Sequence, residues 1–386
     1  MSILVVDDNP MNVMVVEEML KRSGYEEVET AQSAEEMLRI LRGSPDEGGA
    51  PPRSIDLILL DLMMPAVDGI EACRLLQSDE RLRDIPVIIV TAIGDSRKLA
   101  EALDAGANDY VTKPINKIEL LARIRSALRL KRELDWHKER DLRLREELNL
   151  ARQVQEAVFP AGVDEEAYRI RSYFRASEEL AGDLYAWHVL DSHRVMIAVM
   201  DAMGHGISSS LISMFTASVL KEAMHAQIRP ERIVREANRR LMQLRYGNEL
   251  VQYYSTGICA WIDLREGTVE CVNAGHPPGL VVRRGGRRVE RLGATCPPVG
   301  VFEDLAIRSE KVRLEPGDTI YLYTDGLMDL FPGDAEEKTN ALIERLARSG
   351  EDEEALEELL VLGSLDKRPD DRCLVRVDVK GVAETA

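Results

Sequence analysis

The chain has 386 residues, enough for two or three domains of roughly 100–200 residues each, and its 45% hydrophobic residues argue against global disorder. The 68 acidic and 50 basic side chains give a formal charge of −18, which argues against a nucleic-acid partner because phosphate binding requires clustered Lys and Arg. Its 5 scattered cysteines contain no Cys-x-x-Cys pair, which excludes a disulfide framework and a thiolate zinc site and favours a reducing compartment.

The N-terminal residues predict a location inside the cell. Met1 to Asp8 carry carboxylates and no basic segment, so we expect no secretory signal here. No apolar run approaches the roughly 20 residues that cross a bilayer. We therefore expect a cytoplasmic protein without a membrane partner.

Residues 1–116 alternate between short apolar runs and amphipathic stretches. Hydrophobic strands separated by helices indicate a parallel sheet that is covered on both faces. This region is therefore expected to be an α/β doubly wound domain. The expected strands are Ser2–Val6, Val28–Thr30, Ile55–Leu60, Pro86–Val90 and Asp109–Val111, with helices at about 11–23, 33–41, 69–77 and 96–105.

Residues 117–160 are expected to form a long helical linker. From Lys117 to Val158 there is no Gly or Pro, and Arg, Lys, Glu and Leu dominate. Apolar side chains recur at spacings of three, four or seven, with a charged gap around Asp135–Asp141, which predicts one helix or two in series. A helix of this kind often pairs with a copy of itself, so we expect a homodimeric coiled coil. A solvated spacer helix is the alternative.

Residues 161–386 form the second expected globular unit, in which short strands, turn pairs and a few helices predict an α+β domain. The expected strands are Arg169–Phe174, Tyr185–Val189, Val195–Met200, Ser255–Asp263, Thr268–Val272, Leu280–Arg283, Thr319–Thr324 and Cys373–Val379. The expected helices are Ser208–Ala226, Pro230–Tyr246, Ala335–Ser349 and Asp352–Leu362.

Polar side chains stand at the carboxyl ends of strands in the N-terminal domain, where a doubly wound sheet binds its ligands. They are Asp7, Asp8, Asp61, Thr91 and Lys113. A single strand-end Asp usually caps a turn, but three such carboxylates repel one another unless a cation joins them. Carboxylate oxygens suit Mg²⁺, and Lys113 and Thr91 would then each contact a phosphoryl oxygen.

The segments that hold these residues resemble a response-regulator receiver domain. They are Val5-Val6-Asp7-Asp8, Leu60-Asp61-Leu62-Met63-Met64-Pro65, Asp68-Gly69, Val90-Thr91-Ala92 and Tyr110-Val111-Thr112-Lys113-Pro114. The resemblance implies that Asp61 accepts a phosphoryl group from a sensor histidine kinase. It also implies that Asp8, Asp61 and the Met63 carbonyl bind Mg²⁺, that Asp7 supports them, and that Tyr110 occupies a switch position. A receiver-like fold that is never phosphorylated is the alternative.

A second set of carboxylates is dispersed over the C-terminal unit, at Asp183, Asp201, Asp325 and Asp370-Asp371. Three of these positions lie where an apolar strand meets Gly, which lets the backbone approach a bound ion closely. Carboxylates without Cys and with few His suit Mg²⁺ or Mn²⁺, and two such ions can clamp a phosphate and generate hydroxide. A single Asp-Gly pair is also common turn chemistry.

The order and the flanks of these carboxylates resemble the metal-dependent type 2C (PPM-type) serine/threonine phosphatases, in the bacterial SpoIIE/RsbU-like subgroup of sporulation and stress regulators. The matching segments are Ala181-Gly182-Asp183, Asp201-Ala202-Met203-Gly204-His205-Gly206, Asn273-Ala274-Gly275-His276-Pro277-Pro278, Pro316-Gly317-Asp318, Tyr323-Thr324-Asp325-Gly326 and Asp370-Asp371-Arg372-Cys373. The helix from Glu147 to Phe159 also resembles that subgroup. The resemblance implies a β-sandwich flanked by helices.

The resemblance further implies a centre of two Mn²⁺ or Mg²⁺ ions. Asp183 and Asp201 would hold the ions, with Asp201 bridging and the Ala202 carbonyl adding a ligand. Asp325 and Asp370 would complete the shell of the second ion. Spacing alone leaves the neighbouring Asp371 open as the ligand, and we favour Asp370.

The motifs depart from the usual family pattern at two positions, Ala181 in place of Gly and Cys373 in place of Thr, both of which are conservative in size. Two histidines lie in the motifs. His205 follows a Gly and is expected to be structural. His276 is interpreted as a turn residue, with a catalytic base as the alternative.

These observations predict a two-component response regulator whose output is the dephosphorylation of phosphoserine or phosphothreonine on a protein. The resemblance implies attack by metal-activated hydroxide without a covalent enzyme intermediate, on a phosphorylated anti-anti-sigma (STAS-type) protein. A catalytically silent scaffold that binds such a partner is the alternative. A DNA-binding response regulator is disfavoured because the chain has no basic recognition helix.

Overall fold

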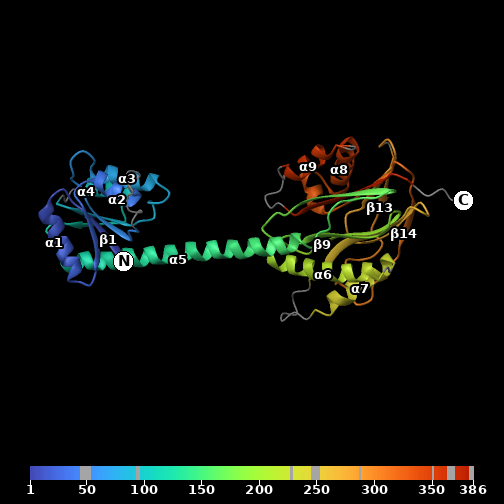
Figure 1. The fold of residues 1–386 in the computed structure, drawn as a ribbon, viewed down its shortest axis with the longest axis horizontal. Coiled ribbons are helices and arrows are strands. Elements are labelled where there is room, and N and C mark those ends of the chain that lie inside the picture. The colour runs from blue at the N-terminus through green and yellow to red at the C-terminus, as the bar shows by residue number, and fades with distance from the viewer. Residues whose placement is uncertain are drawn as a thin grey trace. The chain divides into compact units, whose positions relative to one another are not determined.

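The computed structural model describes residues 1–43, 54–92, 96–226, 229–244, 253–286, 288–349, 352–362 and 370–381. The chain divides into two compact units, Met1–Leu144 and Arg145–Ala386 (Figure 1). Within the described residues, no helix combines the length and the apolar character that a bilayer crossing requires.

The first unit is built on a parallel sheet with the strand order β2-β1-β3-β4-β5. This is the flavodoxin-like doubly wound order, so the predicted fold class is confirmed. The strands are β1 (Ser2–Val6), β2 (Glu27–Ala31), β3 (Leu57–Asp61), β4 (Val87–Thr91) and β5 (Asp109–Thr112). The helices are α1 (Pro10–Lys21), α2 (Ala34–Arg42), α3 (Gly69–Ser78) and α4 (Ser96–Asp104).

The central strands of this sheet are continuous apolar runs because helices cover both of their faces. Every residue of β3 and β4 is buried. Side chains begin three of the helices: Asn9, Ser33 and Asp68 each accept a hydrogen bond from a backbone N–H of the first turn. Because the strands are parallel, their carboxyl ends lie at one edge of the sheet, which is where the predicted polar residues stand.

Helix α5 runs without interruption from Lys117 to Glu156, so the structure has one helix rather than two in series. Its first turns carry Leu120, Ile124 and Leu128, which are buried in the core of the first unit. Farther along, Leu134 and Leu144 are exposed, as the polar composition predicted. The predicted long helical linker is therefore present, and its beginning also packs as part of the first unit.

The second unit is a sandwich of two sheets with the strand orders β14-β11-β10-β9-β8 and β13-β12-β15-β16-β7-β6. The first sheet contains β8 (Asp183–Asp191), β9 (Arg194–Ala202), β10 (Ser255–Asp263), β11 (Thr268–Ala274) and β14 (Glu310–Arg313). The second contains β6 (Val163–Asp164), β7 (Tyr168–Arg175), β12 (Gly279–Val282), β13 (Val289–Leu292), β15 (Thr319–Tyr323) and β16 (Arg372–Val379). Their facing side chains form the core between the sheets.

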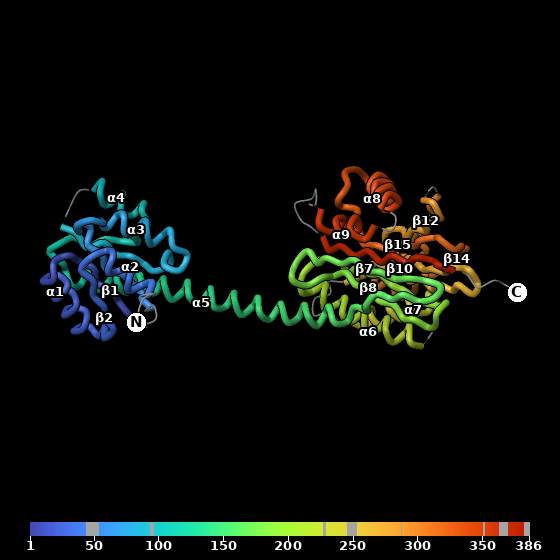
Figure 2. The backbone as a smooth tube through the Cα atoms, turned by 45° about the horizontal axis from the view of Figure 1, so that its top comes forward, coloured from blue at the N-terminus to red at the C-terminus, as the bar shows by residue number. Residues whose placement is uncertain are grey.

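Helices cover both outer faces of this sandwich, which confirms the predicted α+β class. They are α6 (Ile207–His225), α7 (Pro230–Met242), α8 (Ala335–Ser349) and α9 (Glu353–Val361). Figures 1 and 2 both show α6 and α7 on one side of the strands and α8 and α9 on the other. Helix α7 ends before the predicted Tyr246, which lies outside the described residues.

The structure contains elements that the sequence pattern did not predict: strands β6, β13 and β14 and the 3₁₀ helix η1 (Asp325–Leu330). The sequence of β14, Glu-Lys-Val-Arg, has too few apolar residues to show an alternation. It is a strand because its backbone pairs with β11. Helix η1 matters for the site, because Asp325 is its first residue.

Candidate phosphoacceptor site and metal centre

Three carboxylates meet at the carboxyl edge of the first sheet. Asp7 follows β1, Asp8 is its exposed neighbour, and Asp61 ends β3. One oxygen from each lies within 4.8 Å of the others. The Nζ atom of Lys113 donates hydrogen bonds to Asp7 Oδ2 at 2.7 Å and to Asp61 Oδ1 at 2.9 Å. A Lys cation is therefore already part of this carboxylate cluster.

Hydrogen bonds hold these groups in place. The side-chain amide of Asn12 donates to both oxygens of Asp7, at 2.9 and 3.1 Å. Burial raises the pKa of Asp61, and the hydrogen bond from Lys113 opposes that rise. Burial alone would lower the pKa of Lys113, but its hydrogen bonds to Asp7 and Asp61 outweigh burial, so the pKa is raised. Lys113 is therefore charged throughout the physiological pH range.

The other predicted residues of this site lie on neighbouring elements. Thr91 is fully buried at the end of β4, and Met63 is exposed in the loop after β3. Tyr110 on β5 is half-buried, and the Arg123 guanidinium of α5 lies 5.6 Å from the centre of its ring. Arg123 also pairs with Asp109 and Glu119, of which only the Glu119 contact, one helical turn away, could be expected from the sequence.

The four carboxylates of the second set come from both sheets of the sandwich. Asp183, the first residue of β8, stands directly opposite Asp201 of β9 in the antiparallel register. Asp325 follows β15 and Asp370 precedes β16, and these two strands are neighbours in the other sheet. The strand ends thus bring together residues that are up to 187 positions apart in the chain (370 − 183).

These carboxylates affect one another strongly. Burial, followed by the charge of Asp201, raises the pKa of Asp183 well above its usual value. Burial and then Asp325 and Asp370 raise the pKa of Asp201 to about 8. Burial also raises the pKa of Asp325 to about 6, and it raises the pKa of Asp370. A group of buried like charges favours a cation at its centre.

One further observation fits a cation at this centre. Asp183 Oδ2 is buried and has no hydrogen-bond partner among the described residues. In the same part of the chain, no three of these carboxylates bring oxygens within 4.8 Å of one another, unlike Asp7, Asp8 and Asp61. The second set is therefore more open than the first and has an unsatisfied acceptor. Its donor atoms are the carboxylate oxygens that Mg²⁺ and Mn²⁺ prefer.

Asp370 and Asp371 have different surroundings. Asp371 accepts hydrogen bonds from Ser177 N and Oγ at 2.7 and 2.9 Å, and from Gly182 N at 2.7 Å. Both of its oxygens therefore anchor the loop that leads to Asp183. Asp370 accepts from the backbone N–H of Asp371 at 2.8 Å and shares the carboxylate cluster with Asp201 and Asp325.

Two glycines bring the backbone close to the carboxylates. A Cβ on Gly182 would lie 3.0 Å from the Ala202 carbonyl oxygen, which is the predicted backbone ligand. A Cβ on Gly326 would lie 2.0 Å from the Asp371 carbonyl oxygen, so no larger residue fits there. Cys373, where the sequence departs from the family pattern, is fully buried, and its backbone N–H donates to Thr324 Oγ1 at 3.0 Å.

Sequence reasoning missed a contact of the neighbouring Ala181. The side chain of Gln155, near the end of α5, donates to the Ala181 carbonyl at 2.8 Å and accepts from its N–H at 3.0 Å. Both residues are buried, so no water competes for these bonds. Ala181 is two residues before Asp183, and the helix is thereby joined to the loop that carries this carboxylate. The polar Gln155 among apolar positions was the available signal.

The two histidines of the motifs differ in their environment. His276 is buried, its Nδ1 lies 2.8 Å from Thr256 Oγ1, and burial lowers its pKa to about 3. A ring that stays neutral and enclosed fits the interpretation as a turn residue better than that as a base. His205 is exposed, and its Nδ1 lies 2.9 Å from Glu178 Oε1.

Comparisons with known proteins match the two parts of the chain to two different families. Residues 3–125 match the model of the response regulator receiver domain, and residues 191–380 match that of stage II sporulation protein E (SpoIIE). Asp201, Asp325 and Asp370 lie inside the second match, whereas Asp183 precedes it. The predicted resemblance to both families is thereby confirmed.

Each of these curated relatives matches only a part of this chain. The phosphoserine phosphatase RsbP of Bacillus subtilis is 38% identical over 188 residues, which are 49% of this chain and 46% of RsbP. The DNA-binding dual master transcriptional regulator RpaA of Synechocystis is 39% identical over 127 residues, which are 33% of this chain and 48% of RpaA. The chain thus spans about half the length of the curated relatives it matches.

Solved structures show the fold of the second unit. The SiaA-PP2C domain of Pseudomonas aeruginosa has a TM-score of 0.52 at 18% identity, covering 62% of this chain and 98% of that one. The RsbU and RsbW domains of Rv1364c from Mycobacterium tuberculosis have a TM-score of 0.50 at 22% identity, covering 58% and 64%. This chain therefore carries a response-regulator receiver domain followed by a SpoIIE-type phosphatase domain of the PP2C fold.

Proposed function

We propose that the C-terminal domain hydrolyses phosphoserine or phosphothreonine on a protein and that the receiver domain controls this activity. The observation that carries the proposal is the convergence of Asp183, Asp201, Asp325 and Asp370 at one end of the sandwich, with pKa values raised by burial and by one another. The similarity to a phosphoserine phosphatase over half of this chain supports the same reaction.

The four carboxylates would hold two Mn²⁺ or Mg²⁺ ions, with Asp201 between them and the Ala202 carbonyl as a further ligand. Bound ions of this kind neutralise the carboxylates, polarise the phosphoryl group and activate water for in-line attack. Asp183 Oδ2, which has no hydrogen-bond partner in the described part of the chain, and the raised pKa values support this occupancy. The chain's own contribution is to hold the carboxylates in place: Asp371 fixes the loop before Asp183 through Ser177 and Gly182.

In the receiver domain, a sensor histidine kinase would phosphorylate Asp61. Asp8, Asp61 and the Met63 carbonyl would hold Mg²⁺, and Asp7 would orient the site. The Lys113 ammonium group already donates a hydrogen bond to Asp61, and the same group could donate to an oxygen of a phosphoryl group on Asp61. The buried Thr91 hydroxyl at the end of β4 would contact a second phosphoryl oxygen.

The control would pass along α5. Arg123 of this helix contacts Tyr110 of the receiver domain, and Gln155 of the same helix holds the Ala181 backbone beside Asp183. A rotation or a register change of α5 would therefore move the loop that carries a catalytic carboxylate. The exposed Leu134 and Leu144 support self-association of the helix as a homodimer.

The proposed substrate is a phosphorylated anti-anti-sigma protein of the STAS type. The test measures phosphate release from such a protein by the full chain in Mn²⁺ or Mg²⁺, with and without acetyl phosphate as a donor to the receiver. We expect metal-dependent release that changes with the donor. Stable binding of the partner without any release in either metal would instead support the scaffold alternative.

A further inference from the structure

His205 and Glu178 form a pair of titratable side chains to which the proposed reaction assigns no role. The Nδ1 atom of His205 lies 2.9 Å from Glu178 Oε1, and the two side chains are 62% and 45% exposed. A carboxylate beside one ring nitrogen orients an imidazole and leaves the other nitrogen to exchange a proton with a substrate. Such a pair can serve in acid–base chemistry when it stands beside the reacting groups.

Glu178 stands on a loop that is fixed at the carboxylate centre. Its neighbour Ser177 donates hydrogen bonds from N and Oγ to Asp371, at 2.7 and 2.9 Å. At the other end of the same loop, the N–H of Gly182 donates to Asp371 at 2.7 Å. Because Asp371 adjoins Asp370, one of the proposed metal ligands, these hydrogen bonds keep Glu178 close to the centre.

His205 is held against the same loop by its two glycine neighbours. The Gly204 carbonyl oxygen would lie 3.2 Å from a Cβ on Gly182. Gly206 has a left-handed backbone, with φ at +81°, and a Cβ there would lie 3.0 Å from Glu178 Oε2. Larger residues at these positions would press the two segments apart. The glycines therefore allow the imidazole and the carboxylate to meet beside the centre.

The charge of His205 reaches one of the proposed metal ligands. Burial is the largest effect on Asp370 and raises its pKa, whereas a protonated His205 is among the effects that lower it. Such an influence fades within about 10 Å, so the two side chains are near each other. The Nε2 atom of His205 has no hydrogen-bond or ion-pair partner within the described residues. The imidazole thus stands beside the centre with one nitrogen available to a substrate.

We propose that His205 is the general acid of the phosphatase reaction and that Glu178 positions it, an inference that rests on the proposed function. Water adds to phosphorus while the bond from phosphorus to the serine or threonine oxygen breaks. The electron pair of that bond stays on the leaving oxygen, which takes the proton from His205 Nε2 and becomes a hydroxyl group. The water oxygen remains on the released phosphate with one proton. Its other proton goes to solvent, from which the exposed His205 regains its own.

The test compares leaving groups. Nitrophenyl phosphate and phenyl phosphate are similar in size, but nitrophenolate leaves readily without a proton, phenolate less so, and the serine oxygen of a phosphoserine peptide least. In saturating Mn²⁺, we expect His205→Gln to lower the kcat of the full chain about a hundredfold or more with the peptide, less with phenyl phosphate, and hardly at all with nitrophenyl phosphate. A residue that only supports the fold would affect all three substrates alike.

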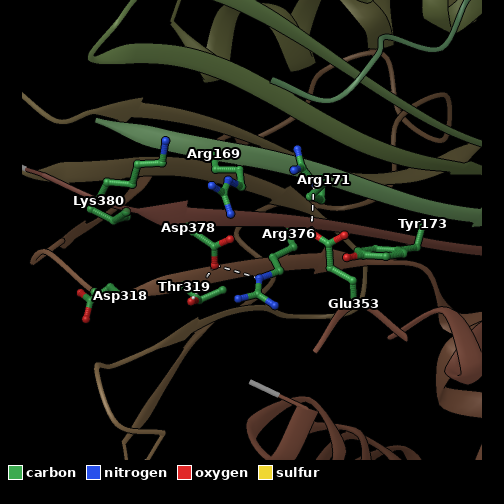
Figure 3. A pocket seen from close by; sticks show the side chains of 11 residues that line it. Arg169, Arg171, Tyr173, Asp318, Thr319, Glu353, Arg376, Asp378 and Lys380 are labelled. Atoms are coloured by element: carbon green, nitrogen blue, oxygen red, sulfur yellow. Dashed lines mark hydrogen bonds and ion pairs between the residues drawn. The ribbon is translucent and has the colours of Figure 1, made fainter. Parts of the chain in front are cut away.

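Two further variants and a binding measurement accompany this test. Glu178→Gln should give the same order of substrates with a smaller loss, and it should add nothing to His205→Gln in the double variant. Glu353→Gln is the matched control, because Glu353 is similarly exposed, at 57%, and also pairs with a basic side chain, that of Arg171 at 3.2 Å (Figure 3). It should hydrolyse all three substrates like the unchanged chain. Calorimetry should show equal Mn²⁺ affinity for His205→Gln and the unchanged chain, because His205 is not a proposed ligand.

The outcomes distinguish this role of His205 from the proposed function. The assignment is overturned if His205→Gln loses activity equally on all three substrates, keeps full activity on the peptide, or binds Mn²⁺ more weakly. If the unchanged chain hydrolyses none of the three substrates in Mn²⁺, the proposed function itself is wrong, and the role of His205 falls with it.

Discussion

The two carboxylate clusters of this chain each hold several negative charges close together, but they differ in how these charges are balanced. In the receiver domain, Lys113 lies between Asp7 and Asp61, so a protein cation balances part of the negative charge. In the phosphatase domain, no basic side chain makes an ion pair with Asp183 or Asp201 among the described residues, and their pKa values rise instead. We therefore expect the cluster with its own cation to take part in phosphoryl transfer and the cluster without one to depend on added metal.

The largest expected effect concerns the cluster without a cation. Asp201→Asn removes the carboxylate that stands opposite Asp183, and we expect the hydrolysis rate to fall by at least about a thousandfold. Phosphate release in saturating Mn²⁺ is the measurement. Asp304→Asn, an exposed residue of the same domain, serves as the control and should retain full activity. Full activity of Asp201→Asn, or of the unchanged chain in EDTA, would falsify the metal-dependent mechanism.

The second prediction concerns the phosphoacceptor. Asp61→Asn keeps the shape of the side chain but removes the nucleophilic carboxylate beside Lys113, so labelling by radioactive acetyl phosphate should fall to background. Metal-dependent hydrolysis without a donor should persist, because the other cluster is unchanged. Labelling of Asp61→Asn at the level of the unchanged chain would show that another residue accepts the phosphoryl group.

The third prediction concerns how the stability of the domain that holds Asp201 depends on pH. The folded pKa of Asp201, about 8, is above the ordinary value of 3.8, so the folded state holds a proton that the unfolded state has lost between these pH values. The metal-free phosphatase domain should therefore become less stable as pH rises from about 4 to 8, by up to about 1.4 kcal/mol per pH unit for each such group. Denaturant unfolding in EDTA measures this slope. Mn²⁺ should flatten it, and Asp201→Asn should reduce it.

The smallest expected effect concerns communication between the clusters. Two Gly residues inserted near Asp141 interrupt α5 without touching either cluster, so the donor-dependent change in hydrolysis should disappear while basal hydrolysis remains. Gln155→Ala should also reduce the donor response, because it releases Ala181 from the helix. If regulation survives the insertion, direct docking of the domains replaces the helix as the route. Paired assays with and without acetyl phosphate decide this point.

Local patterns in the sequence predicted most of the helices and strands. The strands Ser2–Val6 and Ser255–Asp263 and the helix Ala335–Ser349 were predicted with the bounds that the structure has, because their apolar spacing follows from which face is buried. The motif residues were also found from the sequence, since Asp and Gly at the ends of apolar strands mark positions where backbone turns away from a sheet.

Only the tertiary structure decided how these residues differ from one another. Asp370 and Asp371 are adjacent in sequence, yet only Asp371 accepts hydrogen bonds from Ser177 and Gly182, which are 194 and 189 positions away. Strand β14 and the pairing of Arg171 with Arg376 likewise depend on partners that are distant in the chain. Local periodicity records which side of an element is buried, but hydrogen bonds and charge pairs depend on which distant groups the packed sheets bring together.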